Sequence, residues 1–528
     1  MMKPGNTTMR GVLAAVFLGL LALYALTAQR GVSWQDSGEF QRRARVGDLA
    51  GVEGVARAHP LYVACLHALT RTFPPSADLW AINAFSGLGM AVAAAVCVWL
   101  VWRMTGHTLA SVGAGLLLGL SHMAWWMATA AEVYTWSLAL LLMETAALYA
   151  LIARPQPRTL WWLALISGIG LSVHNFALLS LPVWAMAAGW LMWRRALPVW
   201  AVGPAVVAWL AGASAFLALV AGSAFGSGRL AEALRDALFG GYQVQVLGLA
   251  PTLSWTLLIA NLALFALSLA SPLWVAAADG WRGIRHLEPR VFSVCLVALS
   301  GIHVLFFVRY FVPDQATFCL PTLGVASLWV GVGLAVRFER SGWPARTQVA
   351  LVVAGLACLL AVPVGLATLA RMYAWEPPRA RVIPFRDEAR YWLLPWKQAE
   401  HSADDFARAV HAQCGRNDVI YADSTAAGPL TVALLTKNEW QENPLVVTYY
   451  DRWTGDHEAW QAFLRRVAAR PFYVVSPVPG YVPDSLLNGD FAFVKTGVLY
   501  RVHSNSHDGA ETPYGVTTNG LETAKRRL

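Results

Sequence analysis

Residues 80–102 read WAINAFSGLGMAVAAAVCVWLVW, a continuous apolar run without a single charged side chain. A helix of ~20 such residues crosses the hydrocarbon core of a bilayer. Working outward from this stretch, further apolar runs follow one another, separated by charged or turn-rich breaks. The sequence therefore predicts about eleven membrane spans, at residues 11–29, 80–102, 108–127, 133–152, 160–174, 176–193, 197–221, 252–277, 291–309, 316–336 and 348–370.

The composition of the 528-residue chain excludes most other classes of protein. Hydrophobic residues make up 57% of the chain and charged residues only 13%, against ~25% charged residues in soluble domains. A soluble fold this poor in charge could not cover its surface. The six cysteines show no CxxC or Cys/His ligand spacing, so neither a disulfide framework nor a zinc site is indicated. What remains is a multi-pass integral membrane protein whose first partner is the lipid bilayer.

The net charge of +9 belongs to the membrane part of the chain. Residues 1–372 hold 23 Lys and Arg against 13 Asp and Glu. If the N-terminus is cytoplasmic and the spans alternate, 13 of these cations lie on cytoplasmic segments and 4 on the short outer connectors. This is the bias that the positive-inside rule describes. The other six cations lie on the long first outer loop, which is nearly neutral because it also holds five acids. Because no basic run is interleaved with aromatic residues on a soluble face, a nucleic-acid partner is excluded.

The chain changes character at about residue 373. Of the last 156 residues 35 are charged, a value typical of soluble proteins. Short apolar strands are predicted at 418–422, 445–449 and 472–475, with helices at 425–435 and 457–469 between them. We therefore expect a membrane domain over 1–372, with its first outer loop at 30–79, followed by a small soluble α/β domain on the outer side over 373–504 and a disordered tail over 505–528.

Acidic residues are rare in the membrane domain, so each one near a span indicates a function. Asp36 and Glu39 follow the first span and share one face of a predicted short helix over 36–46. Two such carboxylates suit a general base and its partner or a cation ligand. The alternative is structural: Asp36 or Ser37 caps the helix and Glu39 reaches back in a capping box.

Other polar residues fall in connectors on the same predicted outer side. Taken singly, each has an ordinary explanation, such as a helix-start charge for Glu132 or an interfacial ion pair for Arg309 and Asp314. Taken together, they favour one outward-facing, partly buried polar site. Its members are Asp36, Glu39, His59, Glu132, Tyr134, His174, Asn175, Arg309, Asp314 and Gln315. Glu144 lies in mid-span, either as a structural acid or as part of a deeper pathway.

Five motifs in these segments resemble those of the GT-C glycosyltransferase superfamily, and in particular the transmembrane protein O-mannosyltransferases and their bacterial relatives. The resemblance covers about residues 10–325, and the loop motif departs from the group's usual His-Pro-Pro-Gly. The motifs are WQDSGEF (34–40), HPLY (59–62), WWMATAAEVYTW (125–136), GLSVHN (170–175) and VPDQATFCLP (312–321).

The resemblance implies a GT-C fold, a sugar donor carried on a polyprenyl phosphate, and catalysis on the periplasmic or lumenal side. It implies that Asp36 is the catalytic base and that Glu39 orients the acceptor or keeps Asp36 ionised. Arg309, with Arg42 or Arg43, would neutralise the leaving phosphate. Glu132, Tyr134, His174 and Asn175 would line the sugar pocket, and His59, Asp314 and Gln315 are further substrate-binding candidates. No cofactor follows from the resemblance; a divalent cation stays open, because the superfamily contains metal-dependent and metal-independent members.

The sequence thus predicts a hexosyltransferase of a bacterial inner membrane. It would move a sugar from a polyprenyl-phosphate donor to a hydroxyl of an acceptor protein or glycan, inverting the anomeric carbon. Two alternatives stay open. A transporter or lipid flippase is less favoured, because no internal repeat is visible and the polar residues gather at one face. A non-catalytic membrane scaffold would tolerate loss of Asp36 and Glu39.

Overall fold

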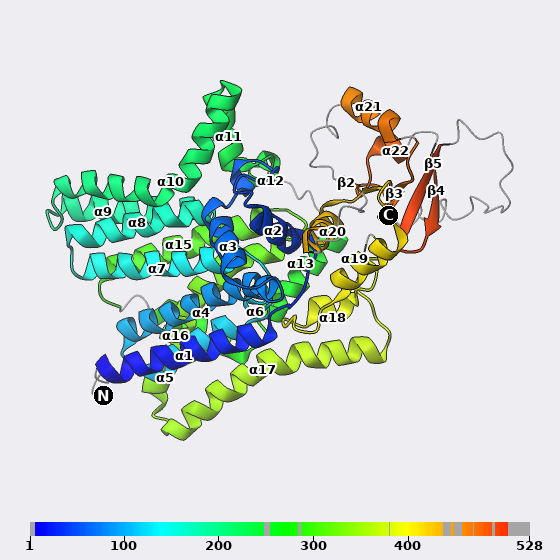
Figure 1. Ribbon diagram of the computed structural model, residues 1–528. Helices are drawn as coiled ribbons and strands as arrows, with labels where there is room; N and C mark the ends of the chain where they lie inside the picture. Colours follow the sequence, from blue (N-terminus) through cyan, green and yellow to red (C-terminus); the bar gives the residue numbers. More distant parts are fainter. Residues whose placement is uncertain are drawn as a thin grey trace. The chain divides into compact units, whose positions relative to one another are not determined.

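The computed structural model describes residues 6–247, 254–283, 287–379, 381–436, 445–447, 457–467, 469–487 and 491–504 (Figure 1). The predicted disordered tail, 505–528, lies outside these residues. The chain forms two compact units. The helical unit contains residues 1–408 and 424–440, and the small unit contains residues 409–423 and 441–528. Residues 373–408 and 424–440, which the sequence assigned to the soluble domain, are therefore part of the helical unit.

The helical unit is built almost entirely of α-helices and short 3-10 turns. In chain order these are α1 (Asn6–Thr27), α2 (Gln35–Val46), η1 (Val55–Arg57), α3 (Pro60–Thr72), α4 (Asp78–Thr105), α5 (Thr108–Leu120), α6 (His122–Ala128), α7 (Tyr134–Ala153), α8 (Pro157–Val173), α9 (Ala177–Trp193), η2 (Val199–Ala201), α10 (Val202–Ser227), α11 (Leu230–Phe239), α12 (Gln243–Leu247), α13 (Trp255–Ser268), η3 (Pro272–Val275), α14 (Ala276–Gly283), α15 (Arg290–Arg309), η5 (Gln315–Cys319), α16 (Leu320–Ser341), α17 (Ala345–Met372), α18 (Glu388–Leu393), α19 (Ser402–Gln413) and α20 (Ser424–Thr436). The unit boundary falls within α19.

The helices confirm the predicted class of a polytopic membrane bundle. Within the described residues, seven helices are long and apolar enough to cross a membrane, or up to nine if each of two bent pairs forms one span. The predicted spans 108–127 and 252–277 correspond to these pairs: α5 and α6 bend by 63°, and α13 and the η3–α14 segment by 88°. Because Ser121 and Ser271 adopt extended backbone angles, each helix breaks there. The predicted spans 160–174 and 176–193 correspond to α8 and α9, of 17 residues each.

Small residues let neighbouring helices approach backbone to backbone. A Cβ on Gly280 of α14 would lie 1.8 Å from the carbonyl oxygen of Trp329 in α16, and one on Gly168 of α8 would lie 2.2 Å from that of Trp209 in α10. Such close contacts substitute for hydrophobic driving force, which is absent between helices in lipid. Two pairs of the bundle are fixed in this way.

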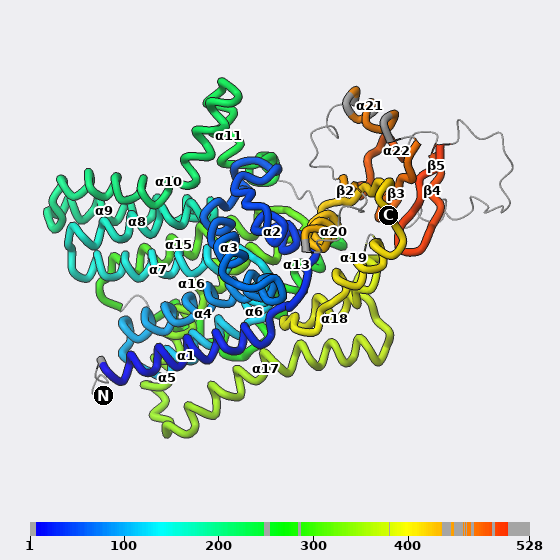
Figure 2. Tube along the Cα trace, viewed as in Figure 1, coloured from blue at the N-terminus to red at the C-terminus, as the bar shows by residue number. Residues whose placement is uncertain are grey.

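The first outer loop is not an irregular connector. It folds into α2, η1 and α3, and Figure 2 shows α2 (blue) beside α20 (gold), which comes from the far end of the chain. The helix α2 ends at Gly47, whose left-handed backbone (φ +71°) closes the last turn with a bond from its N–H to the carbonyl of Arg43. The predicted helix over 36–46 is therefore present.

The small unit contains the predicted sheet, with two strands more than the sequence indicated. Its sheet has the strand order β2-β1-β3-β5-β4. The strands β1 (Val419–Tyr421), β2 (Leu445–Val447) and β3 (Phe472–Val474) are the three predicted ones and run parallel. The antiparallel hairpin of β4 (Phe491–Thr496) and β5 (Leu499–Ser504) was not predicted. The helices α21 (His457–Val467) and α22 (Asp484–Leu487) complete the unit.

Candidate functional site

The N-terminal turn of α2 carries the first acidic motif. The N-cap residue is Trp34, whose side chain makes no capping hydrogen bond. The capping-box interpretation is therefore wrong, because Ser37 and Glu39 have other partners. The Ser37 hydroxyl donates a hydrogen bond of 2.7 Å to Oε1 of Glu132. The first outer loop is thus tied directly to the connector between α6 and α7.

Asp36 presents its carboxylate at the surface of this turn. Its side chain is 48% exposed, and Oδ2 lies 3.7 Å from Nη2 of Arg57. Arg57 is itself held by an ion pair of 2.8 Å with Glu53 and by the ring of Tyr242, 5.6 Å from the guanidinium carbon. No role was predicted for Arg57. Its place two residues before the loop histidine is the signal that could have drawn attention to it.

Two further carboxyl groups interact electrostatically with Asp36. Glu132 is only 6% exposed, and burial together with the negative charge of Asp36 raises the pKa of Glu132 to about 8, against the opposing hydrogen bond from Ser37. Asp314 keeps contact with solvent, yet desolvation by the surrounding protein and the charge of Asp36 raise the pKa of its carboxyl to about 6. Three acids from three distant segments therefore form one electrostatic cluster.

The backbone of Glu132 is fixed by Ser86 of α4, which Tyr62 of the loop motif contacts in turn. The Glu132 N–H donates to Oγ of Ser86 (2.9 Å), and the Ser86 hydroxyl donates to the Glu132 carbonyl (3.0 Å). The Tyr62 hydroxyl lies 3.1 Å from the same Ser86 oxygen. Although the motif reads HPLY, its last residue thus contributes to the scaffold under the acid cluster.

His59 and His174 stack on each other beside the cluster. Their ring centroids are 4.8 Å apart with an interplanar angle of 19°. His59, in a left-handed backbone (φ +47°), donates from Nδ1 to the Val173 carbonyl at 3.0 Å, whereas Nδ1 of His174 accepts from the Phe176 N–H at 3.1 Å. Burial lowers the pKa of His59 well below its usual value and that of His174 to about 3. Both rings are therefore neutral, and Tyr134 extends the stack at 5.4 Å from His174.

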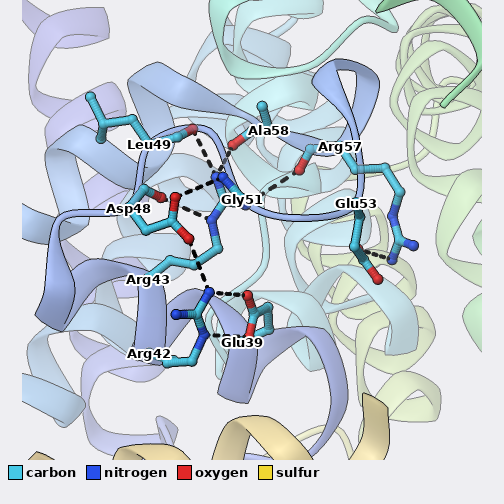
Figure 3. Close-up of polar contacts among 9 residues, drawn as sticks. All are labelled: Glu39, Arg42, Arg43, Asp48, Leu49, Gly51, Glu53, Arg57 and Ala58. Carbon is cyan, nitrogen blue, oxygen red and sulfur yellow. Dashed lines mark hydrogen bonds and ion pairs between the residues drawn. The ribbon is translucent and has the colours of Figure 1, made fainter. Parts of the chain in front are cut away.

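Glu39, Arg42 and Arg43 form a network that holds the first outer loop (Figure 3). Arg42 binds both carboxylate oxygens of Glu39, at 2.8 and 2.7 Å, and reaches Asp48 at 3.0 Å. Arg43 is buried and donates to the backbone carbonyls of Asp48, Leu49, Arg57 and Ala58. Burial lowers the pKa of Arg43. Both guanidinium groups are thereby engaged in folding the loop.

The remaining predicted site residues lie around this centre. Asn175 contacts the Leu238 carbonyl of α11 at 3.5 Å, and Gln315 is buried with its amide donating to the Phe307 carbonyl at 2.8 Å. Arg309 is the last residue of α15 and is half-buried. Glu144 accepts a hydrogen bond from Ser180 and lines a small cavity deeper in the bundle together with His303.

The acid cluster combines groups of different chemistry. One exposed carboxylate stands next to a guanidinium, two neighbouring carboxyls retain protons to higher pH, and two neutral imidazoles with a tyrosine form an aromatic wall. Such a site can accept a proton, donate hydrogen bonds to hydroxyl groups and neutralise an anion. Among the residues that the structure describes, no group of three or more His, Cys, Asp or Glu has the geometry of a metal site.

The fold is similar to that of two solved structures of ArnT. The crystal structure of ArnT from Cupriavidus metallidurans bound to undecaprenyl phosphate matches with a TM-score of 0.58 at 14% identity, over 96% of this chain and all of that chain. The apo form of the same protein matches with a TM-score of 0.54 at 14% identity, over 96% and 99% of the two chains. At 14% identity the two matches confirm the predicted fold.

One protein is similar to part of this chain in sequence. The protein O-mannosyl-transferase TMEM260 of Mus musculus is 29% identical over 121 residues, which are 23% of this chain and 17% of that protein. The match thus spans about a sixth of the relative's length. No protein-family model matches the chain.

Proposed function

We propose that this protein is a membrane glycosyltransferase that moves a sugar from a polyprenyl-phosphate donor to an acceptor hydroxyl, with Asp36 as the general base. The observation that carries the proposal is the cluster of Asp36, Arg57, Glu132 and Asp314 within a GT-C fold. Asp36 is the exposed acid of the cluster and so the one that an acceptor can reach.

In the proposed reaction the acceptor hydroxyl gives its proton to the Asp36 carboxylate while its oxygen attacks the anomeric carbon. The bond between that carbon and the phosphate oxygen breaks, and polyprenyl phosphate leaves with the electron pair. Attack from the face opposite the leaving group inverts the anomeric centre. The proton on Asp36 then passes to water, which completes the cycle.

Arg57 is suited to the charge that develops on the leaving phosphate. Its guanidinium lies beside Asp36, and a planar fork of donors fits phosphate oxygens well. This assigns to Arg57 the role that the sequence had suggested for Arg309. A protonated Glu132 carboxyl, at pH values below about 8, is a hydrogen-bond donor for a sugar hydroxyl.

Support for the donor class comes from the similar structure. ArnT was crystallised with undecaprenyl phosphate, and the mouse relative carries the name of an O-mannosyl-transferase. We accordingly propose a polyprenyl-phosphate-linked hexose as donor. The excess of cations on alternate connectors supports a periplasmic site in a bacterial inner membrane, with the small unit on the same side.

The test uses the full chain in proteoliposomes with undecaprenyl phosphate carrying one radiolabelled hexose at a time. Octyl glycosides and Ser/Thr peptides serve as acceptor probes. We expect a labelled product with the native chain and none with Asp36→Asn. The matched control is Glu232→Gln on α11, whose side chain is also 48% exposed. Full activity of Asp36→Asn would remove Asp36 from its role, and substrate exchange without a covalent product would favour a transporter.

A parallel test in cells reports on the natural acceptor. Surface glycans and glycoproteins are compared by mass spectrometry between cells that produce the native chain and cells that produce Asp36→Asn. A mass increment of one hexose that is present only with the native chain identifies the product. Identical spectra in the presence of equal amounts of folded protein would argue for the scaffold alternative.

A further inference from the structure

The backbone that leads into Asp36 is held by residues almost 370 positions later in the chain. The Val32 N–H donates to Oδ1 of Asp404 at 3.2 Å, and the indole N–H of Trp34 donates to the Ser402 hydroxyl oxygen at 2.8 Å. The Trp34 ring, only 2% exposed, packs on Phe406 with centroids 5.3 Å apart. The first turn of α19 therefore holds one side of this segment.

The helix α20 holds the other side. A Cβ on Gly428 would lie 2.6 Å from the carbonyl carbon of Gly38 and 2.7 Å from the nitrogen of Glu39. In the reverse direction, a Cβ on Gly38 would lie 2.9 Å from Cδ of Pro429. At both positions the opposing atoms are backbone or ring atoms that cannot swing aside, so only glycine permits this contact.

The residue immediately before Asp36 has a strained backbone. Gln35 lies in the left-handed region (φ +58°), where residues with a side chain are rarely found. Such a conformation persists only where the surrounding structure enforces it. The helix α2 has no side-chain N-cap of its own. Hydrogen bonds made by Gln29 and Gln41 hold the segment from within the loop. The contacts of Val32, Trp34 and Gly38 with α19 and α20 hold it from outside.

We propose that Ser402, Asp404, Phe406, Gly428 and Pro429 form a C-terminal clasp that sets the position of Asp36 relative to Glu132 and Arg57. This inference rests on the proposed role of Asp36. The clasp residues contact the segment 32–38 and not the carboxylate itself, so they are positioning residues. Transfer reactions lose rate when reacting groups are displaced by about 1 Å, and displacement is what the clasp prevents.

Positioning and mere stabilisation predict different outcomes. If the clasp only stabilises the fold, disrupting it would lower the melting temperature and leave the kcat of each folded molecule unchanged. If the clasp positions Asp36, disrupting it lowers kcat and leaves the KM for the donor unchanged, because donor contacts are untouched. Disrupting such a clasp also moves the Asp36 carboxylate away from Glu132, so the repulsion between the two weakens and the pKa of Glu132 falls.

The decisive variant is Gly428→Ala in the full chain in nanodiscs. Its matched control is Gly415→Ala, where an added Cβ meets no atom within 4 Å. With undecaprenyl-phosphate hexose as donor and an octyl glycoside as acceptor, we expect kcat to fall at least tenfold in Gly428→Ala and the donor KM to stay within twofold. The control should match the native chain in both constants. Native kcat in folded Gly428→Ala would overturn the proposal.

A second variant covers the case in which Gly428→Ala does not fold. Ser402→Ala with Asp404→Ala removes the two hydrogen bonds between α19 and the segment without adding atoms. The same fall in kcat is expected, and its absence overturns the proposal.

Failure of the proposed function is distinguishable from failure of the clasp. If the native chain transfers no hexose, the proposed function fails. The position of Asp36 is then tested by measuring the melting temperature at increasing pH. The melting temperature should fall until Glu132 has lost its proton, so the pH at which it stops falling reports the pKa of Glu132. We expect this pH to be lower in Gly428→Ala and in the double variant than in Gly415→Ala. An unchanged pH in both overturns the clasp.

Discussion

The hydroxyl of Ser37 donates a hydrogen bond of 2.7 Å to a carboxylate oxygen of Glu132, 95 positions later in the chain. This contact joins the DSGE segment of α2 to the EVY segment before α7. The hydroxyl opposes burial and the charge of Asp36, which together raise the pKa of Glu132 to about 8. The protonation of Glu132 under physiological conditions therefore depends on the geometry of α2.

Replacing Ser37 by Ala should move the alkaline limb of the pH–rate profile upward. Transfer is expected to fall as the pH rises through about 8, where Glu132 loses its proton. Without the Ser37 donor the ionised form is less stable, and the limb should shift by about one pH unit. Rates measured from pH 6 to 10 with the native chain, Ser37→Ala and the exposed control Ser227→Ala check this. An unshifted limb would mean that another group governs it.

The difference in stability between the native chain and the Glu132→Gln variant should also depend on pH. A carboxyl with a pKa of about 8 in the folded chain and ~4.3 in the unfolded chain binds more protons when folded between these values. The native protein therefore loses stability as the pH rises from about 4.5 to about 8, whereas Glu132→Gln does not lose this contribution. Melting temperatures across this range should diverge in favour of the variant and then run parallel above pH 8. Glu232→Gln serves as the control, and curves that stay parallel throughout would contradict the expectation.

Much of the helical unit could be predicted from the sequence, because long apolar runs leave few alternatives in a bilayer. The gathering of Asp36, Glu132 and Asp314 could also be inferred, since alternate connectors of a helical bundle emerge on the same side. The pairing of Glu39 with Arg42 was readable from their i,i+3 spacing. The hairpin of β4 and β5 carried a signal in Gly497, which has φ +59° between two runs rich in apolar residues.

Contacts between distant parts of the chain could not be predicted from the local sequence. Nothing near Gly428 or Ser402 indicates that they contact the segment 32–38, because the contact joins parts of the chain almost 400 residues apart. The orientation of Arg57 depends on Tyr242 and Glu53, which come from different elements. Where a site is assembled from several distant segments, spacing within one segment cannot identify its members.

The stacked imidazoles of His59 and His174 should make the protein sensitive to acid. Burial lowers the pKa of His174 to about 3, against ~6.5 in an unfolded chain. The unfolded chain therefore binds more protons below pH 6.5, so stability is complete above that value and is lost progressively as the pH falls toward 3. We expect His174→Phe to retain more of its melting temperature than the native chain between pH 6.5 and 4.5. His503→Phe, on exposed strand β5, is the control and should follow the native curve. A native slope in His174→Phe would assign the acid sensitivity to other groups.

Glu39 and Asp36 should differ sharply in their effect on transfer. Glu39 is bound at both oxygens by Arg42 and helps to fold the loop, whereas Asp36 offers its carboxylate to solvent. Glu39→Gln should therefore reduce kcat less than about tenfold, while Asp36→Asn should reduce it by more than about 100-fold, the scale on which general-base catalysis contributes. Initial rates per folded molecule decide between them. Equal losses in both variants would make Glu39 part of the catalytic machinery.

Arg57→Ala should lower kcat by about 10²–10³-fold, as expected for the loss of a group that stabilises charge in the transition state. Arg57→Lys should recover part of this rate, because an ammonium keeps the charge but not the planar fork. The control is Arg229→Ala, which removes an ion pair of the same length, 2.8 Å, from the exposed face of α11. Native activity in Arg57→Ala together with loss of activity in Arg309→Ala would transfer the phosphate-neutralising role to Arg309. Losses in both would indicate that the leaving phosphate is bound between the first outer loop and the end of α15.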